Sequence, residues 1–242
     1  MVRHLLLCAW LAGGCLVGSA LASTRPATTV CATDQAPRIA DWLGKLAHAE
    51  DAVREEARQQ LLGLKRSQLP ALVKAVEDAL PLAASQVAGL REIVTHVYLS
   101  GEPYNEQAVG FLGVMLPCDD PNENEEPAPI VVEGRLPGFC SYRMLQDGDI
   151  ILAIIDGQPR KLRDKMDLIA SIAAIDPGRQ VQLEILRQGR RLRLILTLDA
   201  RPLDAAAGGG AAQIEAFRNA RQALADAYWQ KHFAPLLARR VS

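Results

Sequence analysis

GDIILAIIDGQP at Gly148–Pro159 and MDLIASIAAIDPGRQVQLEILRQGR at Met166–Arg190 are the two stretches that decide the expected fold. The first is a short apolar run closed by an Asp-Gly pair, which predicts a strand and a tight turn. The second begins with helical spacing from about Asp164 and, after Pro177-Gly178, places apolar residues at every second position. It therefore predicts a helix and then a strand. After a turn at Gln188-Gly189, a further strand is marked by Leu192, Leu194, Leu196 and Leu198.

Upstream of these strands, residues 38–101 have the periodicity of helices. Successive apolar stripes recur at intervals of three or four residues, as expected for helices that each bury one face. The stripes are Ile39, Trp42, Leu43 and Leu46; Val53, Ala57, Leu61 and Leu64; Leu72, Val73, Val76 and Leu80; and Val87, Leu90, Val94 and Val97. Asp51 is expected to cap the second helix and Pro81 to end the third. The helix pairs resemble HEAT-type repeats, and a plain helical bundle is the alternative.

Downstream, residues 202–210 are expected to form a soft linker, because the chain there is rich in Ala and Gly. A C-terminal helix is predicted at residues 211–238. Its apolar stripe is expected to be Ile214, Phe217, Ala220, Leu224 and Tyr228. A helix with large side chains to bury is expected to pack on the helical region instead of trailing from it.

The N-terminus predicts export. Residues 1–22 combine Arg3, an apolar stretch and the small-x-small sequence of Ala20–Ala22, which together are typical of a secretory signal peptide. Residues 23–37 then form a flexible leader without periodicity. An alternative is a lipoprotein anchored through Cys15, although Ala12 stands where such motifs usually carry Leu. We expect a periplasmic or extracellular protein with no transmembrane span in the mature chain.

Composition excludes some function classes. The chain has 242 residues, 49% of them hydrophobic, a formal net charge of −1 and only 5% aromatic residues. A near-neutral chain with few aromatic residues is not expected to bind nucleic acid. Of the cysteines after the signal, Cys118 and Cys140 could form a disulfide in an oxidising compartment, and three unpaired thiols, with Cys31, are the alternative.

A family resemblance joins the strand-rich stretches to GFLGV at Gly110–Val114. In this order, over residues 106–201, the three strings resemble a bacterial PDZ domain of the kind attached to HtrA-type envelope proteases. The resemblance implies an α+β chain with a PDZ-type, partly open β-barrel and two helices. The helical bundle or HEAT-like helices would precede this unit, and the C-terminal helix would follow it.

The same resemblance implies a peptide site. The loop Phe111–Val114 would receive a peptide's C-terminal carboxylate on the backbone N–H groups of Leu112, Gly113 and Val114, and the peptide would add a strand to the sheet. A side chain at Gly113 would intrude on the peptide terminus. From the helix that begins near Asp164, the candidate contacts are Met166, Ile169 and Ala173. For Phe111 and Leu112, simple core packing is the alternative.

An acidic insertion interrupts the resemblance after Pro117. Its carboxylates are Asp119, Asp120, Glu123, Glu125 and Glu126. It could favour basic peptides by charge complementarity, and a solvated loop without a role is the alternative. A calcium loop is not expected, because Pro121 and Pro127 break the required order of ligands. No metal or cofactor is expected.

Catalysis is not expected either. After the signal the histidines are His48, His96 and His232, no G-x-S-x-G string occurs, and the chain outside residues 106–201 is too short for a protease barrel. His48 and His96 are expected on helices, at the surface or in packing. The leading hypothesis is an exported non-catalytic adaptor that captures peptide or protein C-termini, with a second protein bound by the helices. A structural protein with an unused PDZ groove and an unrecognised envelope hydrolase are the alternatives.

Overall fold

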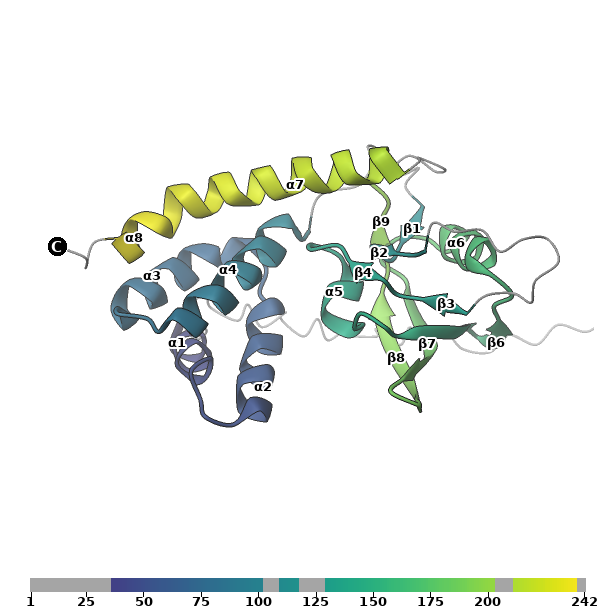
Figure 1. Cartoon of the computed structure of the whole chain (residues 1–242), viewed down its shortest axis with the longest axis horizontal. Coiled ribbons are helices and arrows are strands. Elements are labelled where there is room, and N and C mark those ends of the chain that lie inside the picture. Colours follow the sequence, from purple (N-terminus) through teal and green to yellow (C-terminus); the bar gives the residue numbers. More distant parts are fainter. Residues whose placement is uncertain (1–35, 102–108, 118–128, 203–210, 239–242) are drawn as a thin grey trace, which may run out of the picture. The chain divides into compact units, whose positions relative to one another are not determined.

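The computed structural model describes residues 36–101, 109–117, 129–202 and 211–238 (Figure 1). Helices come first, strands with two short helices follow, and a long helix closes the described part. Because helices and strands are segregated along the chain, the architecture is of the α+β kind. The expected signal peptide and lipid anchor, residues 23–35 of the expected leader, Cys118 and the acidic insertion lie outside the described residues. The last two residues of the expected leader, Ala36 and Pro37, already belong to the first helix, so the leader was predicted two residues too long.

The helical region contains α1 (Ala36–Lys45), α2 (Asp51–Leu62), α3 (Leu69–Ala79) and α4 (Ala84–Leu99). Two local expectations were wrong. Asp51 is the first residue of α2, and the capping position before it is Glu50. His48 lies in the exposed turn between α1 and α2, where its ring nitrogen Nδ1 accepts a hydrogen bond from the Glu50 N–H at 3.1 Å.

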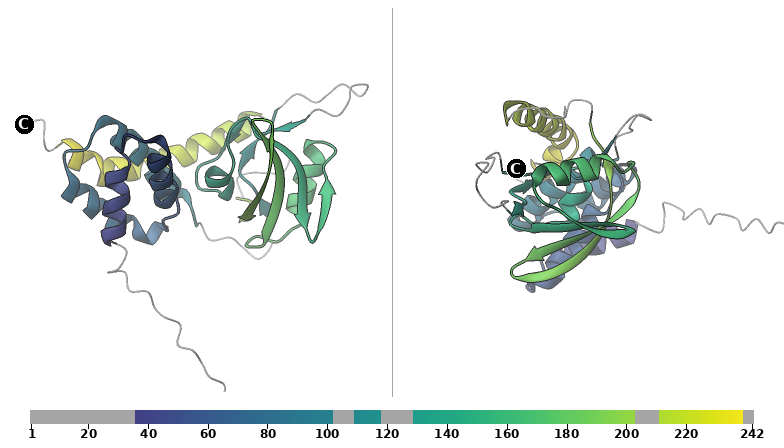
Figure 2. Two further views of the ribbon diagram at one scale, coloured as in Figure 1. Left: turned by 90° about the horizontal axis from the view of Figure 1, so that it is seen from below. Right: turned by 90° about the vertical axis from the view of Figure 1, so that its right-hand side faces the viewer.

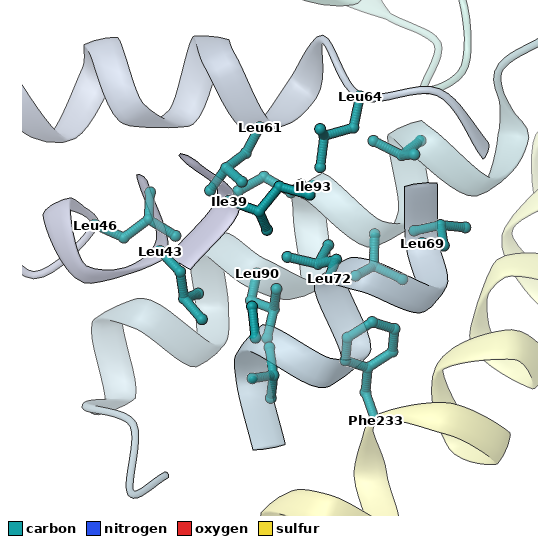
Figure 3. Close-up of a cluster of buried hydrophobic side chains, with 14 of the residues drawn as sticks. Ile39, Leu43, Leu46, Leu61, Leu64, Leu69, Leu72, Leu90, Ile93 and Phe233 are labelled. Atoms are coloured by element: carbon teal, nitrogen blue, oxygen red, sulfur yellow. The ribbon is translucent and has the colours of Figure 1, made fainter. Parts of the chain in front are cut away.

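One apolar cluster holds these helices together (Figure 3). Ile39, Leu43, Leu61, Leu72 and Leu90 are fully buried in it and come from all four helices. The cluster also takes in Trp229 and Phe233 from the C-terminal part of the chain, and the Phe233 ring points into it. The C-terminal helix therefore packs on the helical region, as the sequence predicts.

The C-terminal helix α7 (Ala211–His232) is followed by the short helix α8 (Ala234–Ala238). The predicted apolar stripe of α7 was only partly right, because Phe217 is buried and Tyr228 is partly buried, whereas Ile214, Ala220 and Leu224 are exposed. The buried face is formed by Phe217, Arg221, Ala225 and Trp229. These residues recur every four positions, and the sequence pattern hid them because the second position is an arginine. No helix among the described residues combines the length and the apolar character needed to cross a membrane.

The strands form three separate sheets in the described part of the chain. The largest has the order β3 (Ile130–Val131), β5 (Ile150–Asp156), β7 (Gln180–Arg187), β8 (Arg190–Thr197), and β6 (Gln158–Lys161) pairs with β5. The two small ladders pair β1 (Gly110–Phe111) with β9 (Asp199–Ala200) and β2 (Val114–Met115) with β4 (Gly134–Arg135). Figure 2 shows that the long strands curve.

The turns between the long strands fall where the sequence places them. Gly157, with a φ of 83°, connects β5 to β6, and Gln188 and Gly189, with φ of 49° and 77°, connect β7 to β8. Two successive residues with positive φ are the signature of a two-residue hairpin turn. The register Gln180↔Thr197 to Arg187↔Arg190 then puts Val181, Leu183 and Ile185 on the buried face.

Two helices accompany the strands, α5 (Cys140–Met144) and α6 (Lys165–Ala173). The Asp164 side chain caps α6 by accepting a hydrogen bond from the Asp167 N–H at 2.7 Å. Leu168 and Ile172 of α6 are buried against the inner faces of the long strands, in a cluster that includes Leu183 and Ile185. This second apolar cluster fixes α6 beside the β1–β2 segment.

Candidate functional site

The short strand β2 has one paired edge and one edge without a strand. On the paired edge, the carbonyls of Gly113 and Met115 accept hydrogen bonds from the N–H groups of Leu136 and Glu133, at 2.8 and 3.0 Å. Because bonding directions alternate along an antiparallel strand, the N–H and C=O of Val114 point to the opposite edge. In the described part of the chain, no strand pairs with β2 on that side.

Helix α6 runs alongside the β1–β2 segment in the opposite chain direction. At one end, the Gly110 N–H donates to the Ile175 carbonyl at 3.0 Å, just beyond the C-terminus of α6. At the other end, the Lys165 Nζ donates to the Pro117 carbonyl at 3.2 Å. Gly110 has no room for a side chain, since a Cβ there would lie 2.5 Å from the carbonyl oxygens of Ile172 and Ile175. The helix is thus anchored at both ends of the segment.

The inner side of this arrangement is apolar. Leu112 is 3% exposed and belongs to the same cluster as Leu168 and Ile172 of α6, and the half-buried Val114 packs against that cluster. The predicted loop residues Leu112 and Val114 therefore share an apolar cluster with α6. Core packing, the alternative given for Leu112, describes its side chain. Its backbone N–H, like that of Gly113, donates to no other backbone carbonyl within the described residues.

The side of α6 toward the β2 edge carries exposed apolar side chains. Ile169 and Ala173 follow Lys165 at intervals of four residues, so they lie on the helix line whose first side chain contacts Pro117. Met166 lies beside this line. Met166 and Ile169 are 63% and 38% exposed, in contrast to the fully buried Leu168. We call the region between the unpaired edge of β2 and this line the β2–α6 strip.

Phe111, the first residue of the predicted loop, belongs to a different cluster from Leu112 and Val114. Its ring meets the Phe139 ring edge-on, with centroids 5.0 Å apart, in a small cluster that also contains Phe217 of α7. Its side chain therefore packs within the fold, in agreement with the alternative that the sequence left open, and the predicted peptide contact of Phe111 stays a prediction.

Gly113 has a positive φ of 72°, which favours glycine. A Cβ at this position would lie 2.4 Å from the Phe139 Cβ. For a peptide site, a glycine is expected here because a side chain would block a peptide terminus. The structure adds a stronger reason, since a side chain would also clash with Phe139. The Gly113 carbonyl also accepts a hydrogen bond from the Ser141 Oγ at 3.0 Å, and Ser141 is fully buried.

The segment that backs Gly113 is tied to α4. The Gly138 N–H donates to Nδ1 of His96 at 3.0 Å, and the Tyr142 hydroxyl donates to Glu92 Oε1 at 2.8 Å. The His96 and Tyr142 rings stack with centroids 5.0 Å apart. Glu92 is also held by the Arg58 guanidinium.

These contacts set the protonation states of the cluster. Burial lowers the pKa of His96 to about 4, helped by the nearby cations Arg143 and Arg58 and opposed by Glu92. Burial and the Glu92 charge raise the pKa of Tyr142. Burial alone would raise the pKa of Glu92, but the hydrogen bond and charge of Arg58 lower it. At neutral pH the imidazole is therefore neutral and able to accept the Gly138 N–H.

Cys140 illustrates an unreactive thiol at the start of α5. The thiol is free, and burial together with the charge of Asp199 raises its pKa. A thiol of raised pKa is a poor nucleophile, because the thiolate is the reactive form. The Cys140 N–H donates to the Asp199 carboxylate at 2.5 Å, which connects α5 to β9.

Two cavities lie away from the β2–α6 strip. One, of about 350 Å³, is lined in the helical region by Leu46, Asp51, Arg54, Glu55, Arg58, Ser85 and Gly89. The other, of about 20 Å³, is lined by Leu99, Leu136, Pro137, Arg218, Arg221 and Gln222. Within the described ranges, no three His, Cys, Asp or Glu residues are grouped closely enough to hold a metal ion.

Sequence reasoning missed the residues behind the loop. Phe139, Ser141 and Tyr142 belong to a stretch without clear periodicity, and their partners are far away in the chain. The local signal that existed was Gly138, whose φ is 93° and whose Cβ would lie 2.6 Å from the Leu99 carbonyl oxygen. A glycine after a proline indicates a turn but does not reveal that α4 lies beside it.

Comparison with known proteins gives a partial likeness. No protein-family model and no curated protein matches the chain. Among solved structures, it is similar to the HtrA-type protease AlgW with a decapeptide, at 25% identity over 48% of this chain and 35% of that one, with a TM-score of 0.34. AlgW with a tripeptide is 28% identical over 39% of this chain and 32% of that one, with a TM-score of 0.33. The chain spans about a third of the length of these proteases, and TM-scores of this size do not establish a common fold.

Proposed function

We propose that this protein binds the C-terminal ends of peptides in the β2–α6 strip, in the manner of a PDZ domain. The observation that carries the proposal is the unpaired edge of β2 lying beside the exposed apolar line of α6. An extended peptide placed there would pair with the N–H and C=O of Val114 and extend the β2–β4 ladder. Its side chains would contact Ile169 and Met166 and replace water on them.

The peptide's terminal carboxylate would lie against the β1–β2 loop. The N–H groups of Leu112 and Gly113 donate to no other backbone carbonyl in the described residues, and that of Val114 points to the open edge. Consecutive N–H groups around a residue of positive φ can converge on one anion. The exposed apolar side chains of Met166 and Ile169 favour an apolar final side chain such as Val, Leu or Phe.

In this proposal the protein is a non-catalytic adaptor that works outside the cytoplasm after removal of residues 1–22. Its contribution is affinity for chain ends, and the side chains of the β2–α6 strip supply contacts but no nucleophile. The exposed residues of α6 that border the strip are apolar. The Cys140 thiol, whose sulfur lies 3.9 Å from the Leu112 carbonyl oxygen, has a raised pKa.

The test compares free and amidated peptides on the full chain. Short fluorescent peptides ending in Val, Leu or Phe should bind with dissociation constants in the micromolar range, about −8 kcal/mol. Amidation removes the anion, and a charge-assisted hydrogen bond contributes about 1.5–3 kcal/mol, so affinity should fall about tenfold or more. Equal affinity for the two forms in fluorescence anisotropy would contradict the proposal.

A pair of variants locates the binding. Ile169→Asp puts a charge on the apolar line of α6 and should weaken the free-acid peptide about tenfold or more, because the charge must be buried without a partner or stay hydrated at the expense of contact. Leu224→Asp makes the same change at another exposed apolar residue, on α7, and should leave affinity unchanged. If both variants bind like the original protein, the peptide binds elsewhere.

A further inference from the structure

We propose that helix α4 is a positioning element for the peptide site, acting on Gly113 through the segment Leu136–Tyr142, with Ser141 and Tyr142 as its positioning residues. The inference rests on the proposed function, because it explains how the carboxylate-binding loop is held. It assigns a role in binding to the helical region.

The first step is the hold of the segment on Gly113. Two donors converge on the Gly113 carbonyl, the Leu136 N–H at 2.8 Å and the Ser141 Oγ at 3.0 Å. Phe139 closes the space behind the glycine, where a Cβ would lie 2.4 Å from the Phe139 Cβ. The orientation of the Gly113 carbonyl also fixes the peptide plane that contains the Val114 N–H, because that plane is rigid. The segment therefore sets the direction of a proposed ligand-binding N–H.

The second step is the hold of α4 on the segment. His96 accepts the Gly138 N–H, and Glu92 accepts the Tyr142 hydroxyl, both from one side of α4. Near the end of α4, the Leu99 carbonyl accepts from Arg221 of α7, and the Arg221 guanidinium lies over the Phe139 ring at 4.8 Å from its centroid. Buried hydrogen bonds of this kind restrict the segment because each broken one would leave a polar group unpaired.

Strand β4 provides a second connection between Tyr142 and β2. Arg135, which is paired with Val114 in the β2–β4 ladder, donates to the Tyr142 carbonyl at 3.1 Å and to the Leu145 carbonyl at 2.8 Å. Its guanidinium lies 5.3 Å from the centroid of the Tyr142 ring. Tyr142 thus contacts α4 through its hydroxyl and the partner of β2 through its ring and carbonyl. One residue connects the two regions, and its hydroxyl can be removed without removing the ring.

The experiment uses two hydroxyl deletions with matched controls on the full chain. Ser141→Ala removes the donor to Gly113, and Tyr142→Phe removes the bond to Glu92 while keeping the ring. Ser100→Ala and Tyr98→Phe make the same changes at α4 and its cap without touching the segment, since Ser100 donates to the Val97 carbonyl and Tyr98 stacks on Tyr228. Dissociation constants are measured for free-acid and amidated peptides ending in Val, at a temperature where thermal melts show every variant to be folded.

The free-acid peptide should bind about two- to tenfold more weakly to Ser141→Ala and Tyr142→Phe, because each variant loses one hydrogen bond that holds the loop. The amidated peptide should be affected less. The dissociation constant of the amidated peptide divided by that of the free-acid peptide should therefore fall. The controls should keep the ratio of the original protein. A variant that only loosened the fold would lower the melting temperature and leave this ratio unchanged.

Two results would overturn the inference. Unchanged affinity of both variants for the free-acid peptide would show that α4 does not position the loop, and an equal loss for both peptides would show a general structural effect. Failure of the proposed function is visible separately, because the original protein itself would then bind free and amidated peptides equally. Should Ser141→Ala fail to fold, Tyr142→Phe still decides the question, since its ring and stacking partner remain.

Discussion

The segment from Gly110 to Met115 has two unlike sides. On the side of Phe139, rings are packed together, and the Gly138 N–H and the Gly113 carbonyl both have hydrogen-bond partners. Toward α6, Val114 points its backbone groups at an unpaired edge, and Met166 and Ile169 are exposed. A strand edge can stay unpaired when the opposite side of the segment fixes it. An open edge without such backing would be prone to change register or to pair nonspecifically.

The largest effect on stability is expected from Phe139→Ala, which removes the aromatic ring that packs behind Gly113. Phe139 is 5% exposed, meets the Phe111 ring edge-on and lies under the Arg221 guanidinium. Substitutions of this kind cost about 3–5 kcal/mol in the free energy of unfolding, since apolar burial is lost and a cavity remains. Urea unfolding followed by circular dichroism measures the loss. A loss below about 1 kcal/mol would mean that the packing of Phe139 does not hold the segment rigidly.

The next effect is a pH dependence of stability caused by His96. The pKa of His96 in the folded protein is about 4, below the ordinary value near 6.5 in an unfolded chain. Between these values the unfolded chain takes up a proton that the folded protein does not, so the stability present above about pH 6.5 is lost as the pH falls toward 4. A shift of this size corresponds to roughly 3 kcal/mol.

Thermal or urea unfolding at a series of pH values between 4 and 7 tests this, with two variants for comparison. His96→Gln removes the titrating ring and should flatten the dependence in this range, although its stability at pH 7 is expected to be lower. His48→Gln changes the exposed histidine of the α1–α2 turn and should retain the slope of the original protein. A slope that persists in His96→Gln would assign the effect to other groups.

The sequence predicted features that depend on local patterns better than the residues that pack behind Gly113. Strand alternation at Val181, Leu183 and Ile185, the turns at Gly157 and Gly189 and the start of a helix near Asp164 are local patterns, and the structure has them all. The exposure of Met166 and Ile169 also follows from helical spacing once Leu168 and Ile172 are assigned to the buried face. The loop Leu112–Val114 was found because a family resemblance pointed to it.

The packing on the Phe139 side of the segment depends on contacts between residues that are distant in the chain, and hydrophobic periodicity does not reveal such contacts. His96 carries the pattern of an ordinary helical residue, and only the tertiary structure places it at the Gly138 N–H. The apolar stripe of α7 was predicted only in part because Arg221 is buried beside the Phe139 ring, and apolar patterning assigns an arginine to the surface. The burial of a cation against aromatic rings can be predicted only when the rings that contact it are known.

The smallest effect on stability is expected from Met166→Ala, on the α6 side of the β2–α6 strip. This variant sharpens the contrast with Phe139→Ala. Met166 is 63% exposed, so its truncation should change the free energy of unfolding by no more than about 0.5 kcal/mol. Binding should respond differently, because a methionine that covers a bound peptide loses contact area when it is shortened. A loss of two- to threefold in affinity for the free-acid peptide, about 0.5 kcal/mol, is a reasonable size for a side chain at the rim of an interface.

The comparison within one variant is the informative one. Met166→Ala should bind the peptide more weakly while unfolding at the same urea concentration as the original protein, whereas Leu224→Ala, also an exposed apolar truncation, should change neither quantity. If Met166→Ala destabilised the fold by more than 1 kcal/mol, its side chain would belong to the core and the β2–α6 strip would be closed by its own residues. A peptide site would then require that the strip open first, and the affinity for every peptide would be reduced by the cost of that opening.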